Sequence, residues 1–199
     1  MDIEKFEEAY NTADTCIDSD RMLKIIRDSY SPIKSNGIGY ENLIIAMEEL
    51  SELNIELVKY MSKPSDRIPM TLIEELADVL LSLNYVFDIC ENPIEKINFN
   101  AEVYLDKNQI LNKVILTNSL LQQEISKFLR VKISKHSLAF QASVAKFAIE
   151  DALSCLHLKE QINKAINVKL DRQEQRNCKP NVDYIAEEKE FGDELTSDF

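Results

Sequence analysis

The chain has 199 residues, of which 45% are hydrophobic, and its 35 acidic and 23 basic side chains give a formal net charge of −12. This length and apolar content suffice for one sizeable hydrophobic core. The negative charge argues against nucleic acid as a partner, because a polyanionic backbone is bound by basic surfaces. With only three glycines and five prolines, the sequence lacks the turn residues that an all-β fold needs.

No apolar run approaches the length of a membrane-spanning helix, and the first ten residues are acidic and amphipathic, unlike a signal peptide. We therefore expect a cytoplasmic protein with no membrane partner. The four cysteines are widely spaced, with no CxxC pair and no histidine at zinc-binding spacing. We expect them to be reduced thiols.

Long runs with the 3.6-residue period of an amphipathic helix cover most of the chain and predict an all-α fold. Helices are expected at about 2–16, 19–30, 40–62, 71–91, 94–107, 108–133, 137–157 and 159–177. Thr71 and Glu74 have the spacing of a capping box at the start of one of them. We expect residues 1–177 to form a single all-α domain, followed by an acidic tail at 178–199.

Two acidic pairs at i,i+3 spacing are the most informative feature of the chain. Glu49 and Glu52 lie in one predicted helix, and Glu75 and Asp78 lie in the next. Residues three apart project from the same face of a helix. The two prolines between these helices suit a turn between antiparallel neighbours. Four carboxylates from neighbouring helices would form the all-oxygen site that Mg²⁺ or Mn²⁺ prefers.

A single acidic pair of this kind is most often solvated surface. Here, however, both pairs interrupt the apolar faces of their helices, with Glu49 between Ile45 and Leu53. Unpaired charges on such a face are costly, so a shared cation explains the pattern better. The adjacent Glu48 and Glu74 are expected on the outer faces, as surface residues or as partners of the ligands.

The second half of the chain resembles the first. KFAIEDALSCLHL aligns with MTLIEELADVLLSL, and Leu153 then takes the place of Asp78. An internal duplication with repeats at 38–107 and 108–177 would explain this similarity, and so would the general likeness of any two amphipathic helices. If the duplication is real, the second copy keeps Glu124 and Glu150 but has leucines in place of Glu49 and Asp78, and the chain carries one metal site.

In spacing, order and apolar context, the acidic pairs resemble those of the all-α nucleoside triphosphate pyrophosphohydrolases, the superfamily of MazG-like proteins, dCTP pyrophosphatases and dimeric dUTPases. The family pattern EExxE followed by ExxD appears here as EELSE and ELAD, and the similarity extends over about residues 38–107. The resemblance implies a helical bundle of the MazG-like type, with Mg²⁺ as the cofactor and Mn²⁺ as a substitute. It also implies that Glu49, Glu52, Glu75 and Asp78 are the metal ligands and catalytic residues.

The resemblance further implies side chains that bind the triphosphate. In KINFN, Lys96 and Asn100 match the family's KxDxN cluster, although its aspartate is an asparagine here, and Lys107 follows on the same predicted helix. Lys169 and Arg172 resemble the family's C-terminal KxxR helix. A solvated helix face would explain either cluster equally well. The chain has no tryptophan, whereas dimeric dUTPases usually carry several, so the preferred base stays open.

The interpretation we favour is a Mg²⁺-dependent enzyme that converts an (d)NTP to the monophosphate and pyrophosphate, assembled as a homodimer. The alternative is a non-catalytic helical module, derived from this family, that binds nucleotides or another protein. A di-iron bundle would need Glu-x-x-His pairs, and neither His136 nor His157 has a glutamate three residues before it.

Overall fold

The computed structural model describes residues 3–25, 40–63, 67–91 and 106–178, and every regular element in these ranges is helical, which confirms the all-α prediction. The main helices are α1 (Ile3–Thr12), α3 (Tyr40–Ser62), α4 (Met70–Cys90), α5 (Lys107–Leu129), α6 (Lys135–Cys155) and α7 (Lys159–Cys178). Residues 19–25 are also helical. The helix expected at 94–107 lies outside the described residues except for its last two positions. Of the expected acidic tail, only Cys178 is described, as the last residue of α7.

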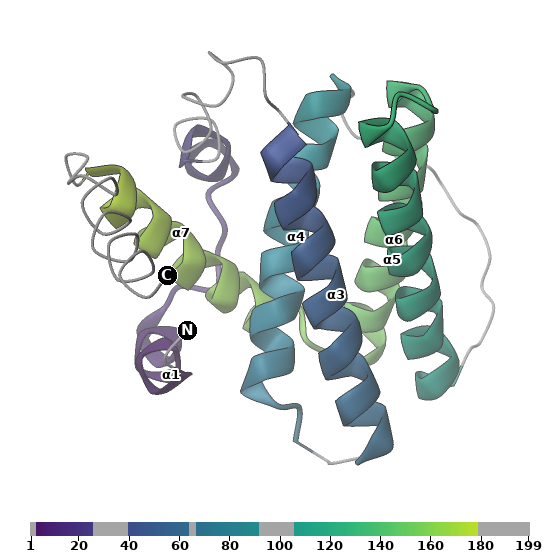
Figure 1. Cartoon of the computed structure of the whole chain (residues 1–199). Coiled ribbons are helices and arrows are strands. Elements are labelled where there is room, and N and C mark those ends of the chain that lie inside the picture. The colour runs from purple at the N-terminus through teal and green to yellow at the C-terminus, as the bar shows by residue number, and fades with distance from the viewer. Residues whose placement is uncertain (1–2, 26–39, 64–66, 92–105, 179–199) are drawn as a thin grey trace, which may run out of the picture.

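Four of the helices form an antiparallel bundle made of two hairpins, α3–α4 and α5–α6 (Figure 1). Polar contacts fix the register within the second hairpin, since Lys113 Nζ lies 2.8 Å from Asp151 Oδ2 near one end, while Ser137 Oγ lies 3.3 Å from Glu124 Oε2 near the other. The hairpins pack side by side, with α3 against α5 and α4 against α6. The internal duplication and the domain boundaries remain predictions, because any two helical hairpins would share this arrangement.

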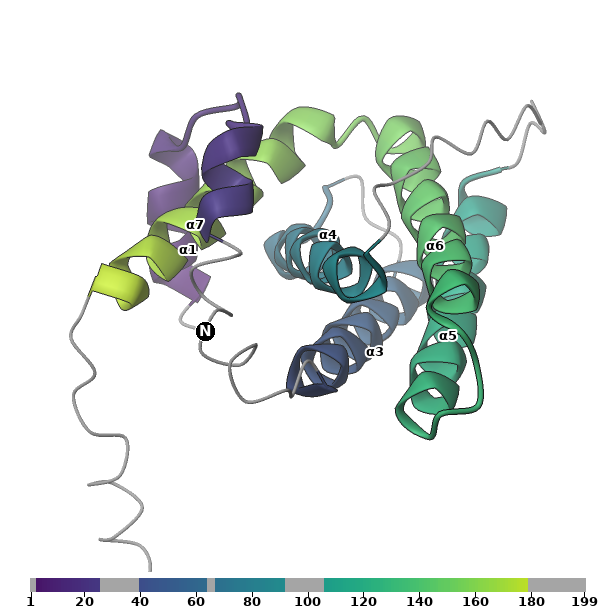
Figure 2. The ribbon, with the colours of Figure 1, turned by 90° about the horizontal axis from the view of Figure 1, so that it is seen from above.

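Helix α4 occupies the centre of the molecule (Figure 2). It contacts α3 and α6 in the bundle, and α7 and α1 cover it from the other direction. Its sequence explains this position, because apolar residues dominate α4 and a helix of that composition is covered on more than one side. The consecutive residues Leu72, Ile73 and Glu74, which project in different directions from the helix, are accordingly all buried.

The hydrophobic core runs through all four bundle helices. Leu50, Leu53 and Leu57 of α3 are almost completely buried, while α6 contributes a row of buried alanines. Such small side chains let a helix approach its neighbours closely, and core packing of this density is sensitive to the loss of a single methylene. Within the described ranges, none of the helices is both long and apolar enough to cross a membrane.

The helix starts are set by local chemistry, and one of them differs from the prediction. Asp106 and Gln109 form a capping box at the start of α5. Helix α4 instead begins at Met70, and its N-cap, Pro69, makes no side-chain hydrogen bond. The predicted capping box at Thr71 is therefore wrong, because Thr71 lies inside the helix. Its hydroxyl donates instead to Glu56 Oε2, 2.8 Å away on α3.

Candidate metal centre

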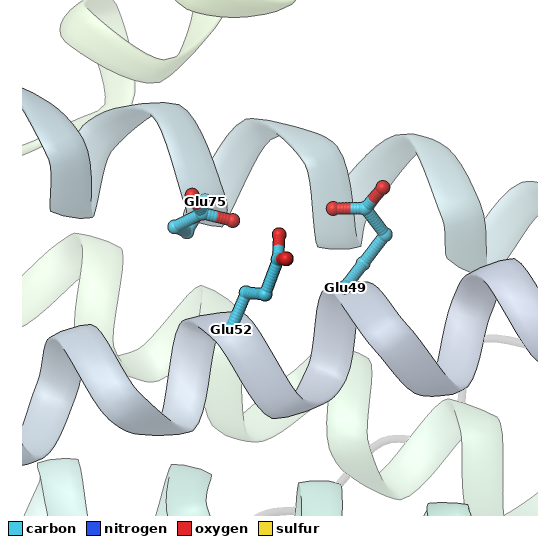
Figure 3. Close-up of side chains that lie close together, drawn as sticks. All are labelled: Glu49, Glu52 and Glu75. Atoms are coloured by element: carbon cyan, nitrogen blue, oxygen red, sulfur yellow. The ribbon is translucent and has the colours of Figure 1, made fainter. Parts of the chain in front are cut away.

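Three of the four predicted metal ligands come together between α3 and α4. Glu49 and Glu52 lie one turn apart on α3 and point toward Glu75 on α4 (Figure 3). One carboxylate oxygen from each residue lies within 4.8 Å of those of the other two. Glu49 and Glu75 are half-buried, whereas Glu52 is exposed. The cluster thus sits at the edge of the hairpin interface, where a small ion could enter from solvent.

The fourth predicted ligand, Asp78, is engaged by a basic side chain. Asp78 follows Glu75 by one turn of α4, and its Oδ2 lies 2.5 Å from Lys169 Nζ on α7. Lys169 Nζ also lies 2.9 Å from Glu74 Oε1. All three side chains are largely shielded from water, with side-chain exposures of 14% for Lys169, 10% for Glu74 and 22% for Asp78.

The expectation that Glu74 lies on an outer face is wrong. The residue is only 7% exposed, because α7 packs on the side of α4 that the prediction left open to solvent. The signal that could have found this is the high apolar content of α4, which indicates a helix that is covered on more than one side. Glu48, by contrast, is exposed on α3, as expected.

Burial and mutual repulsion oppose the ionisation of the carboxyl groups in the cluster. Burial, followed by the charges of Asp78, Glu52 and Glu75, raises the pKa of Glu49 to about 7. Burial, with the charges of Asp78 and Glu52, likewise raises the pKa of Glu75 to about 7. Burial also raises the pKa of Asp78, although Lys169 opposes that rise. Groups that repel one another in this way are stabilised by a bound cation.

The donor set fits a hard divalent cation. Among the described residues, Glu75 Oε2 is buried and has no hydrogen-bond partner, which is costly for an acceptor of this kind. Carboxylate oxygens from three residues can supply part of an octahedral Mg²⁺ shell, with water or phosphate oxygens completing it. The arrangement can therefore hold a metal ion, and it offers no nitrogen or sulfur ligand that would favour zinc.

The predicted phosphate-binding residues do not all lie near the acids. Lys96 and Asn100 are outside the described residues. Lys107 Nζ donates to the hydroxyl of Tyr60 and lies 4.3 Å from the centroid of its ring. This contact borders a cavity of about 290 Å³ at the C-terminal end of α3. Tyr60 follows Glu52 by eight residues, which correspond to a rise of about 12 Å along the helix.

Of the two predicted phosphate-binding residues on α7, Lys169 lies next to the acids and Arg172 contacts α1. Lys169 contacts Asp78 directly, as described above. Arg172, one turn later, places its guanidinium 5.5 Å from the ring centroid of the fully buried Phe6 of α1. Arg21 Nη2, from the helical stretch at 19–25, lies 2.5 Å from Asp171 Oδ1 and so ties that stretch to the same helix. Helix α7 is thereby held between α4 and the N-terminal segment.

A scan of the chain against protein-family models found no match, and searches among curated proteins and solved structures found none either.

Proposed function

We propose that this protein is a Mg²⁺-dependent nucleoside triphosphate pyrophosphohydrolase, which converts an (d)NTP to the corresponding monophosphate and pyrophosphate. The observation that supports this most directly is the convergence of Glu49, Glu52 and Glu75, whose carboxylate oxygens lie within 4.8 Å of one another. These residues come from the two motifs, EELSE and ELAD, on which the family resemblance rests.

The chemistry assigns separate tasks to the side chains. Glu49, Glu52 and Glu75 would hold the ion, with Asp78 as a fourth ligand. When bound, the ion supplies charge neutralisation for the triphosphate and a more acidic water. A carboxylate oxygen that is not used for coordination would orient that water toward the phosphate. An acidic protein also needs the cation to attract a polyanionic substrate at all.

The basic residues would bind the phosphate groups. Lys169 is the candidate that contacts one of the four acids, and Arg172 follows one turn later on the same helix. Lys96, Asn100 and Lys107 are the remaining proposed contacts to substrate, as the family resemblance implies. We expect the protein to be a homodimer. We also expect it to be cytoplasmic, where Mg²⁺ and free nucleotides are available to it.

One observation favours the alternative function, a non-catalytic module that binds nucleotides or a protein. The ion pair between Lys169 and Asp78 already neutralises one of the four acids from within the chain. A chain that no longer bound metal would gain stability from such a pair, because it compensates a charge that burial makes costly.

The decisive test is the release of pyrophosphate from a panel of NTPs and dNTPs with Mg²⁺, with Mn²⁺ and with EDTA. We expect metal-dependent release that is lost in a Glu49→Gln, Glu75→Gln double variant. Glu41→Gln is the matched control, because Glu41 is exposed on the same helix and lies outside both acidic motifs, and it should retain full activity. Folded protein that releases no pyrophosphate from any nucleotide would refute the enzymatic function and favour the binding module.

A further inference from the structure

The Lys169 ammonium neutralises Asp78, a carboxylate of the acid cluster that would otherwise have no basic partner among the described residues. It bridges Asp78 Oδ2 at 2.5 Å and Glu74 Oε1 at 2.9 Å. In the described part of the chain, no ion pair joins Glu49, Glu52 or Glu75 to a basic side chain. The cluster is therefore divided into three carboxylates without a cation and one carboxylate that already has one.

We propose that Lys169 is an internal cation that competes with the divalent metal ion for Asp78, and that Glu74 retains the ammonium when the metal displaces it. This inference rests on the proposed function, because it assigns Asp78 to the metal site. It makes Lys169 and Glu74 positioning residues that set the affinity for metal, separate from any contact they make with substrate.

The competition follows from the distances. A carboxylate oxygen binds Mg²⁺ at about 2.1 Å, so a metal on Asp78 Oδ2 would lie within about 5 Å of an ammonium 2.5 Å from the same oxygen. Two cations at this separation repel each other strongly when water is largely excluded. The ammonium therefore weakens the binding of the metal to Asp78, and the metal weakens the binding of the ammonium.

The surroundings of Lys169 allow it to leave Asp78 without becoming unpaired. Glu74 is 7% exposed and contacts the same ammonium, so a charged partner remains after the Asp78 contact is lost. The ammonium also lies 5.4 Å from the ring centroid of Phe6, close enough for a cation–π interaction. These two groups give the displaced ammonium a second position on the α1 side of α4.

The proposal predicts the direction in which single substitutions change metal affinity. Lys169→Met removes the competitor and should tighten Mn²⁺ binding by about tenfold, which corresponds to about 1.4 kcal/mol. Lys169→Arg keeps the positive charge and should not tighten it. Lys164→Met is the matched control, because Lys164 is on the same helix but lies over the ring of Tyr10, at 5.7 Å. It should change the affinity by less than about twofold.

We would measure Mn²⁺ binding without nucleotide, by calorimetry and by the electron paramagnetic resonance signal of free Mn²⁺, on folded full-length protein. Circular dichroism checks the fold of each variant, and Lys169→Gln replaces Lys169→Met if the latter does not fold. The same substitutions are then made in an Asp78→Asn background. If competition acts through Asp78, the gain from Lys169→Met disappears in that background.

The outcomes separate this inference from the proposed function. Tighter binding in Lys169→Met, lost in the Asp78→Asn background, supports the inference. Mn²⁺ binding that is unchanged or weaker in Lys169→Met overturns it and leaves the metal site intact. An equal gain in Lys164→Met also overturns it, because the effect would then come from net charge alone. No Mn²⁺ binding to any form, Lys169→Met included, overturns both.

Discussion

Replacing Glu75 by Gln should make the metal-free protein more stable at pH 8 and leave its stability at pH 5 nearly unchanged. Burial and neighbouring carboxylates raise the pKa of Glu75 from its ordinary value of 4.5 to about 7 in the folded protein. Between these values the folded protein keeps a proton that the unfolded chain has lost. The stability that this proton contributes is therefore fully present below pH 4.5 and is lost as the pH rises through 7. The amide of Gln is neutral at every pH and has no such loss.

The size of the effect follows from the pKa difference. Each pKa unit corresponds to about 1.4 kcal/mol, so a single isolated carboxyl would lose about 3 kcal/mol over this range. Glu75 is only half-buried, and solvent screening reduces the expected value to about 1–2 kcal/mol. The buried Oε2 atom without a hydrogen-bond partner is the reason to choose Glu75 rather than the exposed Glu52.

Urea unfolding followed by circular dichroism, in EDTA at pH 5, 6, 7 and 8, measures this directly. The free energy of unfolding of the native protein should fall relative to that of Glu75→Gln as the pH rises. Glu48→Gln serves as the control, because this exposed residue of α3 should give a curve parallel to that of the native protein. Parallel curves for the native protein and Glu75→Gln would refute the idea that ionisation of the buried, mutually repelling carboxyl groups destabilises the folded protein.

Three further predictions concern the core, a helix cap and the metal. Leu53→Ala, at a fully buried position, should lower the free energy of unfolding by about 2–5 kcal/mol in urea titrations, whereas Ile55→Ala, 54% exposed on the same helix, should change it by less than about 0.5 kcal/mol. Asp106→Ala removes the capping box of α5 and should cost about 1 kcal/mol, with faster hydrogen exchange in the first turn of that helix. Mn²⁺ at 100 times its dissociation constant should stabilise the native protein by about 2.7 kcal/mol in thermal melts, and the Glu49→Gln, Glu75→Gln double variant should show no such gain.

The proximity of Glu49, Glu52 and Glu75 could be predicted from the sequence, because helix periodicity and turns depend on residues that are close together in the chain. The i,i+3 spacing places Glu49 with Glu52 on one face of α3, and the prolines require a turn that brings α4 back beside it. The interruption of apolar faces by charges indicated that these faces meet. The structure brings Glu75 to the same place as the pair on α3.

What the sequence could not supply was the packing of distant segments. Lys169 lies 91 residues from Asp78, and no periodicity relates the two positions. The burial of Glu74 depends on the same α4–α7 contact, so both were missed for one reason. The capping box at Thr71 failed at shorter range, because α4 begins one residue earlier, at Met70, with Pro69 as its N-cap. The Thr71 hydroxyl donates to Glu56 across the hairpin.

Because Lys169 follows the acids by many residues in the sequence, it is synthesised after all of them. All of the carboxylates in the cluster belong to the α3–α4 hairpin, and Lys169 is made 91 residues after Asp78. At a synthesis rate of about 5–20 residues per second, the hairpin would exist for roughly 5–18 s without its basic partner. During this interval the nascent chain can neutralise its like charges only with protons, with other basic groups or with cations from the surrounding solution. Until α7 has been made, the repulsion among the carboxylates of the hairpin is therefore offset by these other partners alone.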